Sequence, residues 1–82
     1  MVKFTALYFG PVKEALGKDR EEISIDGQVT VQGFKQWLGY RDSQIANILG
    51  SSAMCINLEY VDDEDEIHDR DEVGIIPPVS SG

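Results

Sequence analysis

Apolar and polar residues alternate along the first residues of the chain, and this pattern predicts a strand over residues 2–9. One face of the expected strand is entirely apolar, with Val2, Phe4, Ala6 and Tyr8. The other face begins polar at Lys3 and Thr5 and becomes apolar at Leu7 and Phe9. Proline has no N–H to donate to a sheet, so Gly10-Pro11 ends the strand. About one helical turn over residues 12–16 follows, and Gly17 closes it as a C-terminal cap.

The middle of the chain changes from a strand period to a helix period. Residues 21–25 alternate, with Ile23 and Ile25 expected to face the interior, and Asp26-Gly27 marks a turn. Thr30 can cap a helix that extends to about residue 39. An apolar stripe runs along this helix at the spacing of helical turns, made of Val31, Phe34, Leu38 and Trp37. A second short helix is expected over residues 43–49, closed by Gly50.

The last third of the chain predicts two strands separated by a charged connector. Residues 53–61 alternate as one strand, and residues 73–76 form a short final strand that Pro77-Pro78 stops. Between them, eight of the eleven residues from Asp62 to Glu72 are acidic. The order strand, strand, helix, strand, strand predicts an α+β domain in which a mixed sheet curls over one main helix. We expect this domain to occupy residues 1–78, with an extended tail over residues 79–82.

Charge and length narrow the classes of function. Eighty-two residues make one domain, and a formal net charge of -8 disfavours binding to nucleic acid. An acidic surface favours encounter with a basic partner protein, although it can also serve only to keep the chain in solution. The one cysteine cannot form an internal disulfide, and no signal peptide or membrane-spanning stretch is apparent. We therefore expect a soluble protein of the cytoplasm that does not bind membranes.

Conventional catalytic and metal-binding patterns are weak in this sequence. A Cys55–His68 pair is conceivable, but a cysteine in an alternating strand is more often inert. No phosphate-binding glycine motif occurs, and one cysteine with one histidine is too few for a zinc site. The acidic run from Asp62 to Glu66 suggests calcium, but it lacks the glycine of an EF-hand loop. A solvated loop is the favoured interpretation, and no metal is expected.

The end of the chain is its least ordinary feature. Pro77-Pro78 stiffens the exit from the last strand, and four small residues follow: Val79, Ser80, Ser81 and Gly82. A terminal glycine lets a backbone carboxylate enter a narrow cleft, which would suit covalent activation of that carboxylate. The alternative is a frayed terminus without a role. Local physical chemistry alone favours this second interpretation.

Several motifs resemble those of molybdopterin synthase small subunits, in the same order along nearly the whole chain. They are Leu7-Tyr8-Phe9 followed by the VKEALG stretch at 12–17, Ile56-Asn57 with Tyr60-Val61, Asp71-Glu72-Val73, and the IIPPVS stretch at 75–80. The DEV and IIPPVS motifs near the end are the most specific part of the resemblance. Sulfur carriers of thiamine synthesis and tRNA thiolation share the fold and terminal glycines, but this proline-proline ending is less similar to theirs. The resemblance implies a ubiquitin-like β-grasp fold.

The resemblance also implies a role that depends on two partner proteins. An activating enzyme of the E1 type would use ATP to adenylate the carboxylate of Gly82, which sulfur transfer then converts into a thiocarboxylate. The large synthase subunit would use that sulfur to build the dithiolene of molybdopterin. The chain itself would bind no cofactor and act as a sulfur-donor subunit without catalytic groups of its own. By position, the partner-binding residues implied by the resemblance are Phe9, Tyr60, Ile76, Pro77, Pro78, Val79, Ser80 and Ser81.

The sequence departs from the family at one important position. Members normally end in two glycines, whereas Ser81 precedes Gly82 here. The chain is then a natural variant, or it has lost a final glycine, or it is a relative that no longer carries sulfur. In the last case the function would be that of a non-catalytic ubiquitin-like binding module.

Overall fold

The computed structural model describes residues 1–78. Val79, Ser80, Ser81 and Gly82, and with them the expected tail, lie outside the described residues. The first half contains β1 (Val2–Tyr8), α1 (Gly10–Leu16), β2 (Arg20–Ile25), β3 (Val29–Thr30) and α2 (Val31–Arg41). The second half contains the 3₁₀ turn η1 (Ser43–Ile45), α3 (Ala46–Ser51), β4 (Ala53–Ile56), β5 (Glu59–Val61), β6 (Glu66–Ile67) and β7 (Glu72–Ile76).

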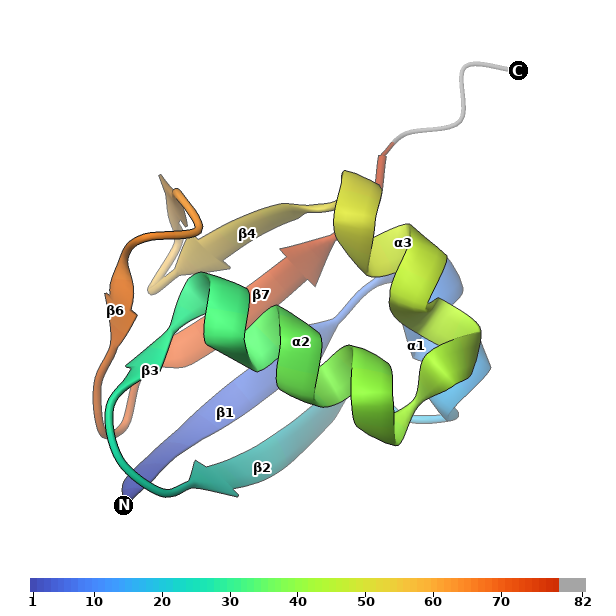
Figure 1. The fold of residues 1–82 in the computed structure, drawn as a ribbon. Coiled ribbons are helices and arrows are strands. Elements are labelled where there is room, and N and C mark those ends of the chain that lie inside the picture. The colour runs from blue at the N-terminus through green and yellow to red at the C-terminus, as the bar shows by residue number, and fades with distance from the viewer. Residues whose placement is uncertain (79–82) are drawn as a thin grey trace.

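The main sheet places the last strand at its centre. Its strand order within residues 1–78 is β2-β1-β7-β4-β5, and β1 and β7 are parallel while the other neighbours are antiparallel. Figure 1 shows α2 and α3 lying across one face of this sheet, with β1 and β7 side by side beneath α2. This arrangement confirms the expected α+β class, a mixed sheet curled over one main helix.

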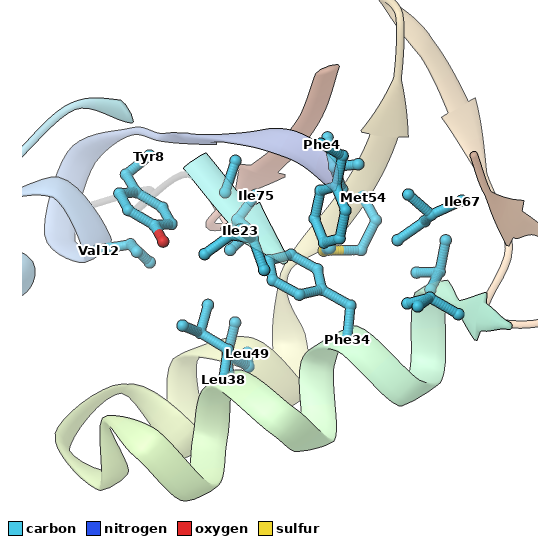
Figure 2. Packing of buried hydrophobic residues seen from close by; sticks show 14 of the residues in the cluster. Phe4, Tyr8, Val12, Ile23, Phe34, Leu38, Leu49, Met54, Ile67 and Ile75 are labelled. Atoms are coloured by element: carbon cyan, nitrogen blue, oxygen red, sulfur yellow. The ribbon is translucent and has the colours of Figure 1, made fainter. Parts of the chain in front are cut away.

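The core fills the space between the sheet and the helices. Alternate residues of β1 point into it, and Phe4, Ala6 and Tyr8 are almost fully buried. From the other side Phe34 on α2 meets Phe4 edge to face, with ring centroids 5.0 Å apart, as Figure 2 illustrates. Such aromatic pairs stabilise a core beyond the area that they bury. The expected apolar stripe of α2 is confirmed for Val31, Phe34 and Leu38, which are fully buried, while Trp37 is half-buried and packs against the core.

Helix boundaries follow the local signals in most places. Thr30 caps α2, because its hydroxyl oxygen accepts a hydrogen bond of 3.0 Å from the backbone N–H of Gly33. Gly17 ends α1 with a φ of 72°, and its N–H donates to the carbonyl of Lys13 at 2.9 Å. The expected end of the second short helix at Gly50 is wrong, because α3 continues to Ser51. Within residues 1–78, no helix has the length and apolar character needed to cross a bilayer.

The expected single strand over residues 53–61 is wrong, because β4 and β5 form a hairpin. Asn57 and Leu58 make its turn with φ angles of 51° and 73°. Positive φ at both central residues matches the right-handed twist of paired strands. The usual glycine is missing from this turn, which is why the sequence reads as uninterrupted alternation.

The acidic connector is also more structured than a solvated loop. Ile67 inside it is fully buried and belongs to β6, which pairs with β3 in a small second sheet. Backbone N–H groups at the start of α2 donate to carbonyl groups of the connector, Val31 to Asp65 at 2.9 Å and Gln32 to Asp63 at 3.0 Å. One buried side chain and these hydrogen bonds attach the charged segment to the helix.

Candidate functional site

The face of the main sheet that points away from α2 carries an apolar surface. Neighbouring residues that face the core, such as Tyr8, Ile75 and Met54, fix which residues face outward. The cross-strand register then aligns four outward residues in one row over β1, β7, β4 and β5: Leu7, Gly74, Cys55 and Tyr60. Sequence reasoning did not include the first three of these in the site.

A second row of outward residues, two positions further along β7, completes this surface. Ile76 of β7 pairs with Ala53 of β4, and Phe9 follows directly after β1. We call the seven residues of both rows the outer apolar surface: Leu7, Phe9, Ala53, Cys55, Tyr60, Gly74 and Ile76. Phe9 is 47% and Tyr60 is 73% exposed, although both are large aromatic residues. Exposed aromatic side chains on one face are typical of protein–protein interfaces.

The backbone around Phe9 holds its ring in place over the sheet. Phe9 is the N-cap residue of α1, and its carbonyl accepts from the N–H groups of Val12 at 3.2 Å and Lys13 at 3.4 Å. A Cβ placed on Gly74 would lie 3.5 Å from Cε2 of Phe9, so the ring rests against β7. Phe9 is thus exposed and lies on the same face of the sheet as Tyr60 and Ile76.

The chain leaves the sheet beside this surface. Ile76 and Pro77 are half-buried, and Pro77 packs near Gly10 at the start of α1. Pro78 is exposed and is the last residue that the structure describes. The segment toward Gly82 therefore begins at the edge of the outer apolar surface.

Charged residues border the outer apolar surface at the end where β7 begins. Arg20 and Glu72 form an ion pair across β1, with Nη2 3.8 Å from Oε2. Asn57 ties the β4–β5 turn to the start of β7: its side-chain oxygen accepts from the N–H of Glu72 at 3.0 Å, and its amide donates to Asp71 at 3.0 Å. The carboxylates of Asp71 and Glu72 thus lie beside β7, whereas Arg20 and the exposed Glu22 lie on the outer face of β2.

A polar cluster on the face of the sheet that points toward α2 joins β1, β2 and α2. The Glu21 carboxylate accepts hydrogen bonds from the Tyr8 hydroxyl at 2.7 Å and from Arg41 at 2.7 and 2.9 Å. The hydrogen bonds from Arg41 lower the pKa of Glu21 from 4.5 to about 2. Burial, together with Glu21, raises the pKa of Tyr8 above its usual range. All of these groups satisfy one another, so the cluster stabilises the fold and offers no free acid or base.

The other candidate residues do not form a reactive site. Cys55 lies on the outer apolar surface, whereas His68 approaches Glu66 at 3.5 Å and Asp71 at 3.9 Å. Among residues 1–78, no group of three or more His, Cys, Asp and Glu side chains is arranged to hold a metal ion. The acidic connector contacts α2 through its backbone carbonyl groups and through an ion pair of 3.2 Å between Asp63 and Lys35.

Comparison with known proteins identifies the family. The family model described as the ThiS family matches residues 6–82. The chain belongs to the ThiS family. Two relatives are similar to this ThiS-family chain over almost its full length, and both are named molybdopterin synthase sulfur carrier subunit. The one from Dictyostelium discoideum is 36% identical, and the alignment covers 98% of this chain and 96% of the relative. The one from Pyrenophora tritici-repentis is 39% identical, and the alignment covers 96% of this chain and 89% of the relative.

Solved structures show the same fold. A Pyrococcus furiosus protein assigned as molybdopterin converting factor subunit 1 superposes with a TM-score of 0.85 at 26% identity, covering 96% of this chain and all of that one. A chain from the complex of subunits 1 and 2 of molybdopterin-converting factor of Helicobacter pylori 26695 gives a TM-score of 0.71 at 20% identity, covering 99% and 100% of the two chains. The resemblance noted from the sequence motifs, and the ubiquitin-like fold that it implies, are confirmed.

Proposed function

We propose that this chain is the sulfur carrier subunit of a molybdopterin synthase. The observation that carries the proposal is the identity of 36–39% over almost the whole chain to two proteins named as such subunits. The geometry supports it, since an exposed apolar surface lies beside the point where the chain departs toward Gly82.

Two partners follow from this proposal. The large synthase subunit binds the outer apolar surface through Phe9, Tyr60 and Ile76 and receives the segment from Pro77 to Gly82. The Helicobacter pylori relative of the same fold is seen in a complex of subunits 1 and 2, which supports a partner of this kind. The second partner is an E1-like activating enzyme. The single cysteine of the chain, which has no disulfide partner, fits a location in the reducing cytoplasm.

The reaction requires activation because a carboxylate is a poor electrophile. In the activating enzyme, the Gly82 carboxylate attacks the α-phosphate of ATP, which releases pyrophosphate and forms an acyl-adenylate. A sulfide donor then attacks the acyl carbon, so that a C–S bond forms, the C–O bond to AMP breaks and AMP leaves. The sulfur of the resulting thiocarboxylate then forms a bond to a pterin carbon in the large subunit as an oxygen substituent leaves that carbon. Water cleaves the acyl C–S bond, which leaves the sulfur on the pterin and restores the carboxylate.

An intact-mass measurement tests the proposal. We expect incubation with the activating enzyme, ATP and a sulfide donor to exchange one oxygen for sulfur. The matched control is a chain extended beyond Gly82, which should not react. If neither the natural chain nor a Ser81→Gly variant gains this mass, the proposed function is wrong.

A second candidate function is a ubiquitin-like binding module without sulfur chemistry. The observation in its favour is Ser81, which stands where the family normally has glycine. This candidate predicts that the chain extended beyond Gly82 still binds its partner with unchanged affinity. A sulfur carrier of thiamine synthesis or tRNA thiolation would gain the same mass but would not support molybdopterin formation with a large subunit.

A further inference from the structure

Gly74 occupies an unusual place for a glycine, the middle of the central strand β7. Glycine weakens a strand interior, and where it occurs it often marks the close approach of another group. The side chains of its neighbours Val73 and Ile75 fill the core, so position 74 points to the other side of the sheet, where Gly74 is itself buried beneath neighbouring side chains. Its partners in the sheet are Leu7 of β1 and Cys55 of β4.

The side chain of Cys55 takes the space that a residue at position 74 would fill. A Cβ built on Gly74 would lie only 2.7 Å from Sγ of Cys55 and 3.5 Å from Cε2 of Phe9. The first distance is far shorter than a van der Waals contact, and the second is an ordinary one. Adding a methyl group would therefore displace the cysteine sulfur, while the backbone of Phe9 stays fixed by α1.

The displaced atom lies in the middle of the surface that we assign to the large subunit. Cys55 stands between Gly74 and Tyr60 in the cross-strand row, and Phe9 lies over the opposite side of Gly74. We propose that Gly74 is a positioning residue for partner docking. Because it has no side chain, Cys55 can pack over Gly74 between Phe9 and Tyr60, and its sulfur does not protrude from the docking surface. The inference rests on the proposed function, since it takes the large subunit as the docking partner.

Four proteins test this inference: the natural chain, Gly74→Ala, Gly74→Ala with Cys55→Ala, and Gly50→Ala as matched control. Gly50 lies on α3, where an added Cβ meets no atom within 4 Å. The first readout needs no partner, because Cys55 is the single cysteine of the chain. We expect Gly74→Ala to change the rate of its alkylation by N-ethylmaleimide about threefold or more, and Gly50→Ala to leave the rate unchanged.

The second readout is the Kd for the cognate large subunit, measured by titration calorimetry. We expect Gly74→Ala to weaken binding about tenfold, and the double variant to recover to within about threefold of the natural chain. Natural affinity in Gly74→Ala would overturn the inference, and so would a folded double variant that binds as weakly as Gly74→Ala. If Gly74→Ala does not fold, the double variant decides, because it lacks the clash: binding more than about threefold weaker than that of the natural chain would overturn the inference.

The two failures can be told apart. If the natural chain does not bind the large subunit at all, the proposed function fails and this inference falls with it. If the natural chain binds and the variants do not follow the expected order, only the role of Gly74 is wrong.

Discussion

The polar cluster around Glu21 makes the folding stability depend on pH in a defined way. In the folded protein the pKa of Glu21 is about 2, against an ordinary value of 4.5. This difference corresponds to roughly 3 kcal/mol of folding free energy at neutral pH. The Arg41 side chain is 35% exposed, and screening by solvent reduces the figure to about 2 kcal/mol. We expect Glu21→Gln to lose this amount at pH 7, while its amide oxygen still accepts from Tyr8.

The sign of the effect follows from the direction of the shift. Because the folded state lowers the pKa of Glu21, the stabilisation is fully present above pH 4.5 and is lost as the pH falls from there toward 2. The difference in free energy of unfolding between the natural chain and Glu21→Gln should therefore shrink by more than half between pH 7 and pH 3.

Urea denaturation followed by circular dichroism at pH 7, 5, 4 and 3 measures this difference. Glu22→Gln is the matched control, because Glu22 neighbours Glu21 on β2 and is exposed. Its effect should stay below about 0.5 kcal/mol. A difference for Glu21→Gln that stays constant from pH 7 to pH 3, or an equal loss in Glu22→Gln, would show that the charge of Glu21 does not stabilise the fold.

Three further outcomes are expected. Asn57→Ala should lower the free energy of unfolding by about 2 kcal/mol, because it removes both side-chain hydrogen bonds between the β4–β5 turn and β7 and the tolerance of asparagine for positive φ. Urea denaturation measures this loss, and an unchanged midpoint would contradict it. Thr30→Ala should cost about 1 kcal/mol in the same assay, since it removes the cap of α2; an intact midpoint would show that the cap is dispensable. Tyr60→Ser should weaken binding to the large subunit about tenfold or more, whereas Tyr40→Ser, at a still more exposed tyrosine on α2, should leave the Kd measured by calorimetry unchanged. Equal effects of the two tyrosine changes would argue against the outer apolar surface as the docking site.

The elements that a single residue period defines could be predicted from the sequence. β1 has an apolar residue at every second position over its whole length, and α2 carries both a capping threonine and an apolar stripe, so their positions followed directly. The β4–β5 turn could not be found, because its positive φ angles fall on Asn57 and Leu58 rather than on a glycine. β6 was missed because Ile67 is the one apolar residue in a run of charges, and only pairing with β3 explains its burial.

The candidate site could be predicted in part. The change from polar to apolar on the outer side of β1 pointed to Phe9, and the family motifs added Tyr60 and Ile76. Leu7, Cys55 and Gly74 join them only through the register of β1, β7 and β4. Register depends on which strands are neighbours, and the parallel pairing of the first and last strands is a contact between distant parts of the chain that local patterns do not contain.

The central position of β7 has a consequence for how the protein is made. Because β7 pairs with both β1 and β4, the sheet stays divided in two until residues 72–76 have left the ribosome. Pairings between such distant segments form late, since closing long loops has an entropic cost. A nascent chain that stops before β7 also lacks Gly74 and Ile76, and with them the middle of the outer apolar surface. A chain cut short before β7 would thus lack both the completed sheet and the middle of this surface, so it would not compete for the proposed large subunit.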